Sequence, residues 1–403
     1  MQNRLIGSAL IIAGTSLGAG MIAMPLATAV IGFWPALLLM LFNWALATYS
    51  GLLVADVCRA CPGVTSLYAA AGQLLGRPGQ LIASLATLFL PYALCAAYIT
   101  GAAGHLNGSL AHWFSVTLPQ GFSAICVTAL FAGVIVISTS SVDLVTRGLF
   151  ILKVMMLVLL IGLLLPRVEP AYLNTMPVSD GVMWAALPLF FTSFGFQATV
   201  PSIVRYLEYK PAQIRPAVIT GSTLPLIIYL LWVIGTNGVL PQDSLVAMQN
   251  GQDPVSALVI GLTRFGGSVW ISTAVNLFAI LALATSFLGV ALGLFDYLAE
   301  AFRRNSTFSG RMQTAVITFV PPLLVALYFS DSFITALGFA AIALVVLAIA
   351  LPVVMTWKLI GGIHGKHYQL PGGRKALLVV MSAGVMIVFV QLAIVSGILP
   401  GIR

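Results

Sequence analysis

Two short clusters of glycine and polar residues interrupt otherwise apolar stretches of this sequence. The first runs from Gly14 to Gly20 (GTSLGAG), and the second runs from Thr192 to Gln197 (TSFGFQ), between Pro188 and Pro201. Because glycine and proline disfavour a helix interior, each cluster predicts a helix that is interrupted near its middle. The amino end of a half-helix offers free N–H groups to a carboxylate, and a carboxyl end offers carbonyls to an ammonium. A ligand with both groups on adjacent atoms is an α-amino acid.

We expect the half-helix that starts near Gly18 to face the carboxylate, and the carbonyls around Ser16 and Phe194 to face the ammonium. A simpler alternative is that Gly14 and Gly18 are close-packing contacts between helices, since small residues four apart often have that role. Interruptions at matching positions in two halves of a chain favour the binding site, because they are a typical sign of a transporter site.

Lys153 is the one strongly charged residue that lies clearly inside an apolar run, about six residues from one end of that run. An ionisable residue inside a membrane is by default a functional hypothesis, here the gain and loss of a proton. The alternative is that the long side chain reaches the headgroups at the near surface. Tyr92 and Tyr98 lie near the middle of another run, but six residues apart they do not share one helix face.

Cys58 and Cys61 form a single C-x-x-C pair. A zinc site would need a second cysteine pair or two histidines at matching spacing, and the sequence has neither. We therefore expect two reduced thiols at a helix end, with no metal and no other cofactor.

The composition places all of these residues in lipid. Of 403 residues, 60% are hydrophobic and 7% are charged, whereas a soluble domain carries about a quarter charged residues. So much apolar surface also excludes a disordered chain. The net charge of +8 does not indicate nucleic-acid binding, because the basic residues form no single patch.

The apolar runs predict eleven membrane-spanning helices, since about 20 residues cross a bilayer. Their approximate ranges are 5–31, 33–57, 80–106, 122–138, 144–165, 181–207, 214–238, 268–299, 313–328, 332–357 and 376–398. With the amino terminus in the cytoplasm, all Lys and Arg residues except Arg167, Arg264 and Arg403 lie on the cytoplasmic side, as the positive-inside rule requires. The carboxyl terminus is then periplasmic. The loops are short, and Asp253-Pro254 is typical of the start of a short surface helix.

The two interrupted helices are the first and the sixth. Five spans run one way and the next five the opposite way, so residues 1–165 and 181–357 are predicted to be inverted repeats, followed by an extra helix at 376–398. The predicted fold is an all-α integral membrane protein with a five-plus-five inverted-repeat transporter architecture.

Three stretches resemble the bacterial hydroxy/aromatic amino acid permeases of the amino acid–polyamine–organocation superfamily, and above all their tyrosine-specific branch. They are AGTSLGAGM at 13–21, FTSFGFQATVPSIV at 191–204 and ATSFLGVALGLFDYLA at 284–299. The resemblance implies a symporter of the bacterial inner membrane that imports an aromatic L-amino acid with protons by alternating access. L-tyrosine is the expected substrate, and tryptophan or a broad aromatic range is the alternative.

The resemblance also implies roles for particular residues. The expected substrate site comprises Thr15, Ser16, Gly18, Ala19, Gly20, Tyr92, Tyr98, Phe191, Phe194, Gly195, Phe196, Gln197 and Asn276. Gln197 stands where the family pattern has His, and a Gln cannot be protonated as a His can. Gln197 and Asn276 are the candidates to bind a ring hydroxyl. The expected proton-coupling site comprises Lys153, Ala13, Thr285 and Ser286.

Functions of other classes fit less well. A membrane enzyme would need paired histidines, a Ser or Asp dyad, or a metal cluster at one depth, and a channel would need a repeated filter or a polar stripe. Sodium coupling is the main alternative to proton coupling, because Thr285 and Ser286 could bind a cation, although Lys153 would repel it. We expect a lipid bilayer, protons and a small-molecule substrate as the only partners, with no nucleic acid and no obligate protein partner.

Overall fold

The computed structural model describes residues 2–61, 63–64, 66–137, 139–179, 182–249, 254–304, 307–328, 333–360 and 371–402. Within these ranges every regular element is helical, and no strand occurs. Because lipid offers no hydrogen-bond partners, a spanning chain must pair its amides and carbonyls within its own helices. The predicted all-α class is therefore confirmed for this part of the chain.

Nine spans in the described ranges are long and apolar enough to cross a membrane, or ten when the bent pair α1 (Gln2–Ser16) and α2 (Gly20–Ile31) counts as one. The shorter apolar helix α5 (Gln120–Ile137) coincides with the predicted fourth span. The other uninterrupted spans are α3 (Phe33–Ala60), α4 (Leu67–Phe114), α6 (Thr139–Leu164), α9 (Pro211–Val239), α12 (Val269–Ala301), α13 (Phe308–Tyr328) and α16 (Gly373–Val395). One further span joins α14 (Phe333–Val345) to α15 (Leu351–Ile360) through a π-helical turn, Val346–Ala350.

Both predicted interruptions are present. The axes of α1 and α2 meet at 60°, and three residues separate the two helices. The second broken span consists of η3 (Val182–Ala186), α7 (Leu187–Ser193), η4 (Gln197–Thr199) and α8 (Val200–Tyr206). Pro201 lies in the first turn of α8, where its missing N–H costs no hydrogen bond.

Two segments differ from the predicted boundaries. The helix α4 begins at Leu67 rather than near residue 80, because the Ser66 side chain accepts a hydrogen bond from the Ala69 amide at 3.3 Å and caps the helix. It bends at Gly76, whose φ of 72° is open to glycine. Between α9 and α12 there are two surface helices, α10 (Gln242–Gln249) and α11 (Pro254–Gly266), of which only the second was predicted. Asp253 lies outside the described residues.

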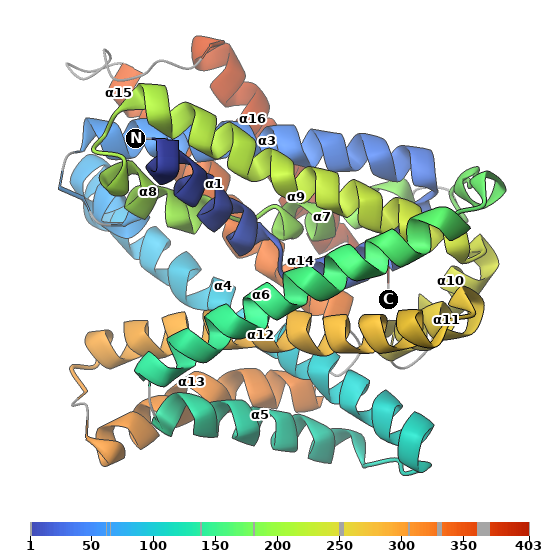
Figure 1. Ribbon diagram of the computed structural model, residues 1–403. Helices are drawn as coiled ribbons and strands as arrows, with labels where there is room; N and C mark the ends of the chain where they lie inside the picture. Colours follow the sequence, from blue (N-terminus) through green and yellow to red (C-terminus); the bar gives the residue numbers. More distant parts are fainter. Residues whose placement is uncertain are drawn as a thin grey trace.

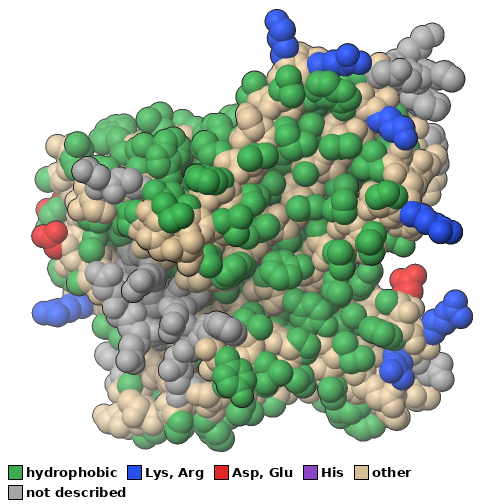
Figure 2. All heavy atoms as spheres, turned by 180° about the vertical axis from the view of Figure 1, so that it is seen from behind, with side chains coloured by type: hydrophobic (Ala, Val, Ile, Leu, Met, Phe, Trp, Pro, Cys, Tyr) green, Lys and Arg blue, Asp and Glu red, His purple; other side chains and the backbone are tan. Residues whose placement is uncertain are grey.

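The long helices lie roughly along a common axis, with α4 and α5 running in opposite directions, and the two chain ends lie at opposite ends of the bundle (Figure 1). The short helices α10 and α11 cover the end away from the amino terminus. Hydrophobic side chains cover the middle of the rear face, whereas Lys and Arg lie at its margins, most of them at the end that holds the amino terminus (Figure 2). An apolar band between charged margins is the surface expected of a chain that spans a bilayer.

Candidate functional site

The polar backbone groups exposed by the first break are paired with side chains from three other helices. The Ala19 amide donates to the Ser286 hydroxyl of α12 at 2.9 Å. The carbonyl of Leu17 accepts from Lys153 of α6 at 2.7 Å. The carbonyl of Ser16 accepts from the Tyr229 hydroxyl of α9 at 2.5 Å. These groups are therefore satisfied although no helical ladder continues through the break.

The second break lies against the first. The Tyr229 hydroxyl also lies 2.9 Å from the Ser193 carbonyl, at the end of α7, so one side chain contacts both breaks. A Cβ built on Gly20 would lie 2.8 Å from the Ser193 hydroxyl, which leaves room only for glycine. The ring of Phe194 packs edge-on against Tyr229, with 5.2 Å between centroids. The two interruptions that the sequence predicts thus form one centre.

Lys153 is buried at this centre. Besides the Leu17 carbonyl, its Nζ lies 3.2 Å from the Thr285 hydroxyl of α12 and 4.5 Å from the centroid of the Phe150 ring. The side chain therefore points inward between α1, α6 and α12, not toward the surface. Ala13 is buried one turn before Leu17, and its carbonyl accepts a hydrogen bond from the Leu17 amide at 2.9 Å. Ser286 follows Thr285 and binds the Ala19 amide, so the four predicted coupling residues lie around one point.

Several predicted substrate residues also meet at the two breaks. Phe191 and Phe194 are fully buried. The Tyr98 hydroxyl lies 4.0 Å from the position that a Cβ on Gly18 would take. The hydroxyl of Ser16 is buried and has no hydrogen-bond partner in the described part of the chain. Such an unpaired group at a break is available to a ligand.

Other predicted residues lie elsewhere. Gln197 points toward α3, where its Nε2 donates to the Ala47 carbonyl at 3.2 Å and to the Ser50 hydroxyl at 3.1 Å. The neighbouring Phe196 ring packs on the α3 backbone at Gly51. The Tyr92 hydroxyl donates to the Ile317 carbonyl of α13 at 2.7 Å.

The last three predicted positions lie at the edge of the centre or beyond it. Asn276 lines a separate small pocket near α11. Thr15 is exposed and donates to its own helix at Ile11. Gly195 fits closely against Leu344 of α14, which a built Cβ would approach to 3.0 Å.

The structure adds to this centre residues of α9 that were not predicted as site residues. Besides Tyr229, Trp232 donates its indole N–H to the Met21 carbonyl at 2.9 Å, and Asn237 donates to the Pro25 carbonyl at 3.2 Å. All three are buried, and together they hold both the break and the length of α2. The available signal was their type, since Tyr, Trp and Asn within a span need polar partners.

The two halves of the first broken span differ in burial. Every residue of α2 is buried. On α1, by contrast, the exposed residues extend from Asn3 up to Thr15, one residue before the break. The exposed positions of α1 include Ile6, Leu10 and Ile11, whose apolar side chains suit contact with lipid.

Comparison with known proteins shows the family to which the chain belongs. The family model for tryptophan/tyrosine permeases matches residues 1–391. The chain belongs to the tryptophan/tyrosine permease family. A tyrosine-specific transport system of Haemophilus influenzae is 36% identical, over 99% of each chain. A tryptophan-specific transport protein of Pseudomonas aeruginosa is 34% identical, over 94% of this chain and 92% of that one. A glutamine transporter of Aliivibrio fischeri is 32% identical, over 97% of this chain and all of that one.

The permease is thus a multi-pass membrane protein and a transporter, not a member of an enzyme family. Cys58 and Cys61 are both free thiols at the end of α3. Burial raises the pKa of the Cys61 thiol, which keeps it protonated near neutral pH. Among the described residues, no three His, Cys, Asp or Glu side chains are grouped to hold a metal ion.

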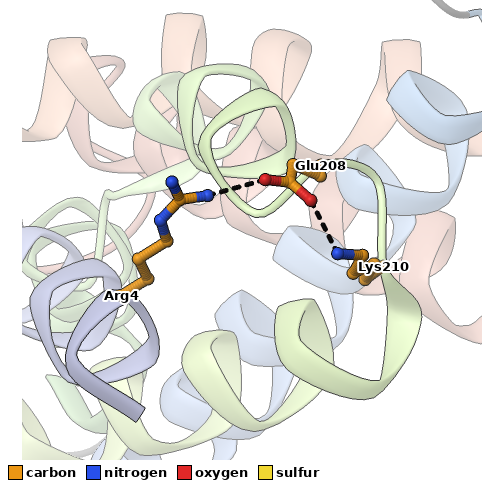
Figure 3. Close-up of polar contacts among 3 residues, drawn as sticks. All are labelled: Arg4, Glu208 and Lys210. Carbon is orange, nitrogen blue, oxygen red and sulfur yellow. Dashed lines mark hydrogen bonds and ion pairs between the residues drawn. The ribbon is translucent and has the colours of Figure 1, made fainter. Parts of the chain in front are cut away.

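At the end of the permease that holds the amino terminus, an ion-pair cluster joins α1 to the segment between α8 and α9 (Figure 3). Arg4 donates to the Glu208 carboxylate at 2.7 Å, and Lys210 donates to its other oxygen at 2.6 Å. The Arg4 guanidinium also lies 5.5 Å from the centre of the Tyr206 ring. Hydrogen bonds from Lys210 and from Arg4 hold the pKa of the Glu208 carboxyl below its usual range. All three charges are exposed, so the cluster positions α1 more than it stabilises the fold.

Proposed function

We propose that this permease imports L-tyrosine with protons across the bacterial inner membrane by alternating access, with tryptophan as the alternative substrate. The observation that carries the proposal is the meeting of the two helix breaks, with Lys153 beside them. Membership of the tryptophan/tyrosine permease family and the names of the tyrosine- and tryptophan-specific relatives support the substrate class.

The amino acid group of the substrate would bind at the first break. The Ala19 amide, at the amino end of α2, has the neutral Ser286 hydroxyl as its acceptor. A carboxylate is a stronger acceptor than a hydroxyl and is favoured by the helix dipole, so it would replace Ser286 there. The Ser16 hydroxyl supplies a further polar contact.

The ring of the substrate would lie among Phe191, Phe194 and Tyr98, which are all buried. Edge-on or offset contacts between aromatic rings contribute about 0.5–1.5 kcal/mol beyond the burial of area. This selects aromatic over aliphatic side chains. Discrimination between tyrosine and phenylalanine needs a polar partner for the phenol, because an unpaired polar group can reject the wrong substrate by about 10⁴.

A competition panel tests the substrate. Purified permease in proteoliposomes takes up labelled tyrosine, and each of the other amino acids is added in excess. Tyrosine and then tryptophan or phenylalanine should compete most strongly. Competition by leucine or glutamine as strong as that by tyrosine would refute the aromatic pocket.

Proton coupling is assigned to Lys153. Its Nζ contacts the Leu17 carbonyl at the break and the Thr285 hydroxyl, so its charge acts directly on the backbone that would hold the substrate. Lys153→Ala should abolish accumulation driven by a proton gradient. Lys153→Arg should fail as well, because a guanidinium does not lose its proton in a protein.

Two measurements decide the coupling. Accumulation in sodium-free buffer, with and without a proton gradient, separates proton from sodium coupling. Counterflow exchange of labelled for unlabelled tyrosine needs no gradient, so it shows whether the Lys153 variants still bind and carry substrate. Accumulation by Lys153→Arg equal to that of the parent would place the coupling site elsewhere.

The architecture that we propose for this function is the five-plus-five inverted repeat, residues 1–165 and 181–357, with an eleventh span at 376–398. The amino terminus is cytoplasmic and the carboxyl terminus periplasmic. No bound metal or other cofactor is required, since the proton gradient supplies the free energy.

A further inference from the structure

His105 on α4 is a buried histidine whose ring nitrogens are both unpaired. The residue is 4% exposed, and neither Nδ1 nor Nε2 has a hydrogen-bond partner in the described part of the chain. Burying a polar group without a partner costs about 1–3 kcal/mol, so such a group needs an explanation. The mechanism above does not use it, because Lys153 lies on α6 and the two breaks lie between α1 and α2 and between α7 and α8.

The His105 ring borders a small pocket where α11 covers α4 and α12. Its polar lining consists of Ser109, Ser256, Thr263 and Asn276, and its cavity volume is about 10 Å³, which corresponds to one water molecule. Thr263 donates its hydroxyl proton to the Val259 carbonyl at 2.9 Å, and its oxygen lone pairs remain acceptors. The pocket therefore offers a water both a hydrogen-bond acceptor, the imidazole nitrogen, and neutral oxygens.

No described residue that lines the pocket carries a charge. The nearest charge along α11 is Arg264, which is exposed and does not line it. On α12, Asp296 follows Asn276 by 20 residues, or about 30 Å of helix. Glu300 lies still farther along α12, and the other helices that pack on α4 carry described charges at Asp56, Arg59, Arg311 and Lys358. Lys358 donates to the Leu74 carbonyl near the start of α4. It therefore lies far from His105, which is 31 residues farther along α4.

We propose that His105 and this pocket form a second proton-binding site, hydrated by one water and closed by α11. A proton from bulk water at the His105 end of α4 adds to the free imidazole nitrogen, and no other bond changes. The imidazolium then has only neutral oxygens around it, so protonation favours the state in which α11 moves away and more water enters. Histidine suits the task, because it is the side chain that ordinarily titrates between about pH 5 and 8.

This inference rests on the proposed function in one respect, the side from which protons arrive: in an importer, the site would take protons from the periplasmic side before the substrate enters. It assigns α11 the role of a cover whose opening depends on pH. It also gives Asn276 a place in proton binding, apart from the substrate site.

Thiol labelling tests the link between protonation and opening. Val259 lies on the pocket side of α11 and is buried, so Val259→Cys, in a variant without the native cysteines, reports when α11 lifts. The matched control carries Val259→Cys together with His105→Gln, which keeps a polar side chain but cannot be protonated. The ratio of the two labelling rates removes the intrinsic pH dependence of the thiol. It should rise as the pH falls from 7.5 to 5, by up to about tenfold per pH unit for a single proton.

A ratio that stays constant over this range overturns the proposal, and so does a pH profile of tyrosine uptake that is identical in His105→Gln and the parent. If His105→Gln does not fold, His105→Asn takes its place in both assays. The labelling assay requires no transport. A rising ratio in a permease whose uptake ignores the proton gradient would therefore support the site and refute the proposed coupling. Loss of accumulation in Lys153→Ala together with a constant labelling ratio would support the proposed coupling and refute the proton site at His105.

Discussion

Tyr229→Phe removes a single hydroxyl from the point where the two helix breaks meet. That hydroxyl lies 2.5 Å from the Ser16 carbonyl and 2.9 Å from the Ser193 carbonyl, in a fully buried position. The ring itself would keep its contact with Phe194. The substitution therefore tests the hydrogen bonds and leaves the packing in place.

The magnitude follows from what each carbonyl retains. The Ser16 carbonyl keeps a second donor, the Gly18 amide at 2.6 Å. The Ser193 carbonyl, at the end of α7, shares the single Tyr229 hydroxyl proton with the Ser16 carbonyl. One buried acceptor is thus left unpaired, not two, and we expect a loss of about 1–3 kcal/mol in the free energy of unfolding. That is about a 5- to 150-fold change in the unfolding equilibrium.

Equilibrium unfolding in detergent micelles measures this loss, and Tyr328→Phe is the matched control, because Tyr328 is 79% exposed at the end of α13. The KM for tyrosine should also rise in Tyr229→Phe, since both breaks lose a shared support. Equal stability of the two variants would show that the hydroxyl does not hold the breaks together.

Three further predictions concern the cluster at α1, the contact of α3 with the second break, and the topology. Above the pKa of an unfolded Glu, about 4.3, the ion pairs of Glu208 stabilise the fold, and this contribution is lost as the pH falls through the lower folded pKa. The thermal unfolding temperature of Glu208→Gln should therefore differ from that of the parent at pH 7 and converge with it at pH 3. A difference of the same size at both pH values would contradict the ion pairing. Gly51→Ala places a methyl group 2.6 Å from the buried Phe196 ring, so it should cost about 1–3 kcal/mol in the same unfolding assay, whereas unchanged stability would mean that the ring is free to shift. In intact cells, a single cysteine at Asp331 should react with an impermeant thiol reagent and one at Gly365 should not; labelling of the Gly365 variant from outside would refute the eleven-span topology.

The sequence alone was sufficient to predict the all-helical class, most of the long apolar helices and the positions of two helix breaks. Lipid forces every spanning segment to satisfy its own backbone, so long apolar runs become helices and glycine clusters such as Gly14–Gly20 mark the exceptions. Lys153 could be singled out for the same reason, since a charge inside a span is costly and needs partners. The cap at Ser66 was missed, because a polar residue before a mixed sequence is a weak signal.

Only the tertiary structure decided which side chains meet. In a membrane protein, the lipid-facing and the buried faces of a helix are both apolar, so hydropathy does not reveal which way a residue points. Gln197 faces α3, Asn276 faces the pocket beside His105, and Tyr229 joins the two breaks from a helix with no break of its own. Each of these positions depends on how helices distant in sequence pack together, and the residues around each position do not predict that packing.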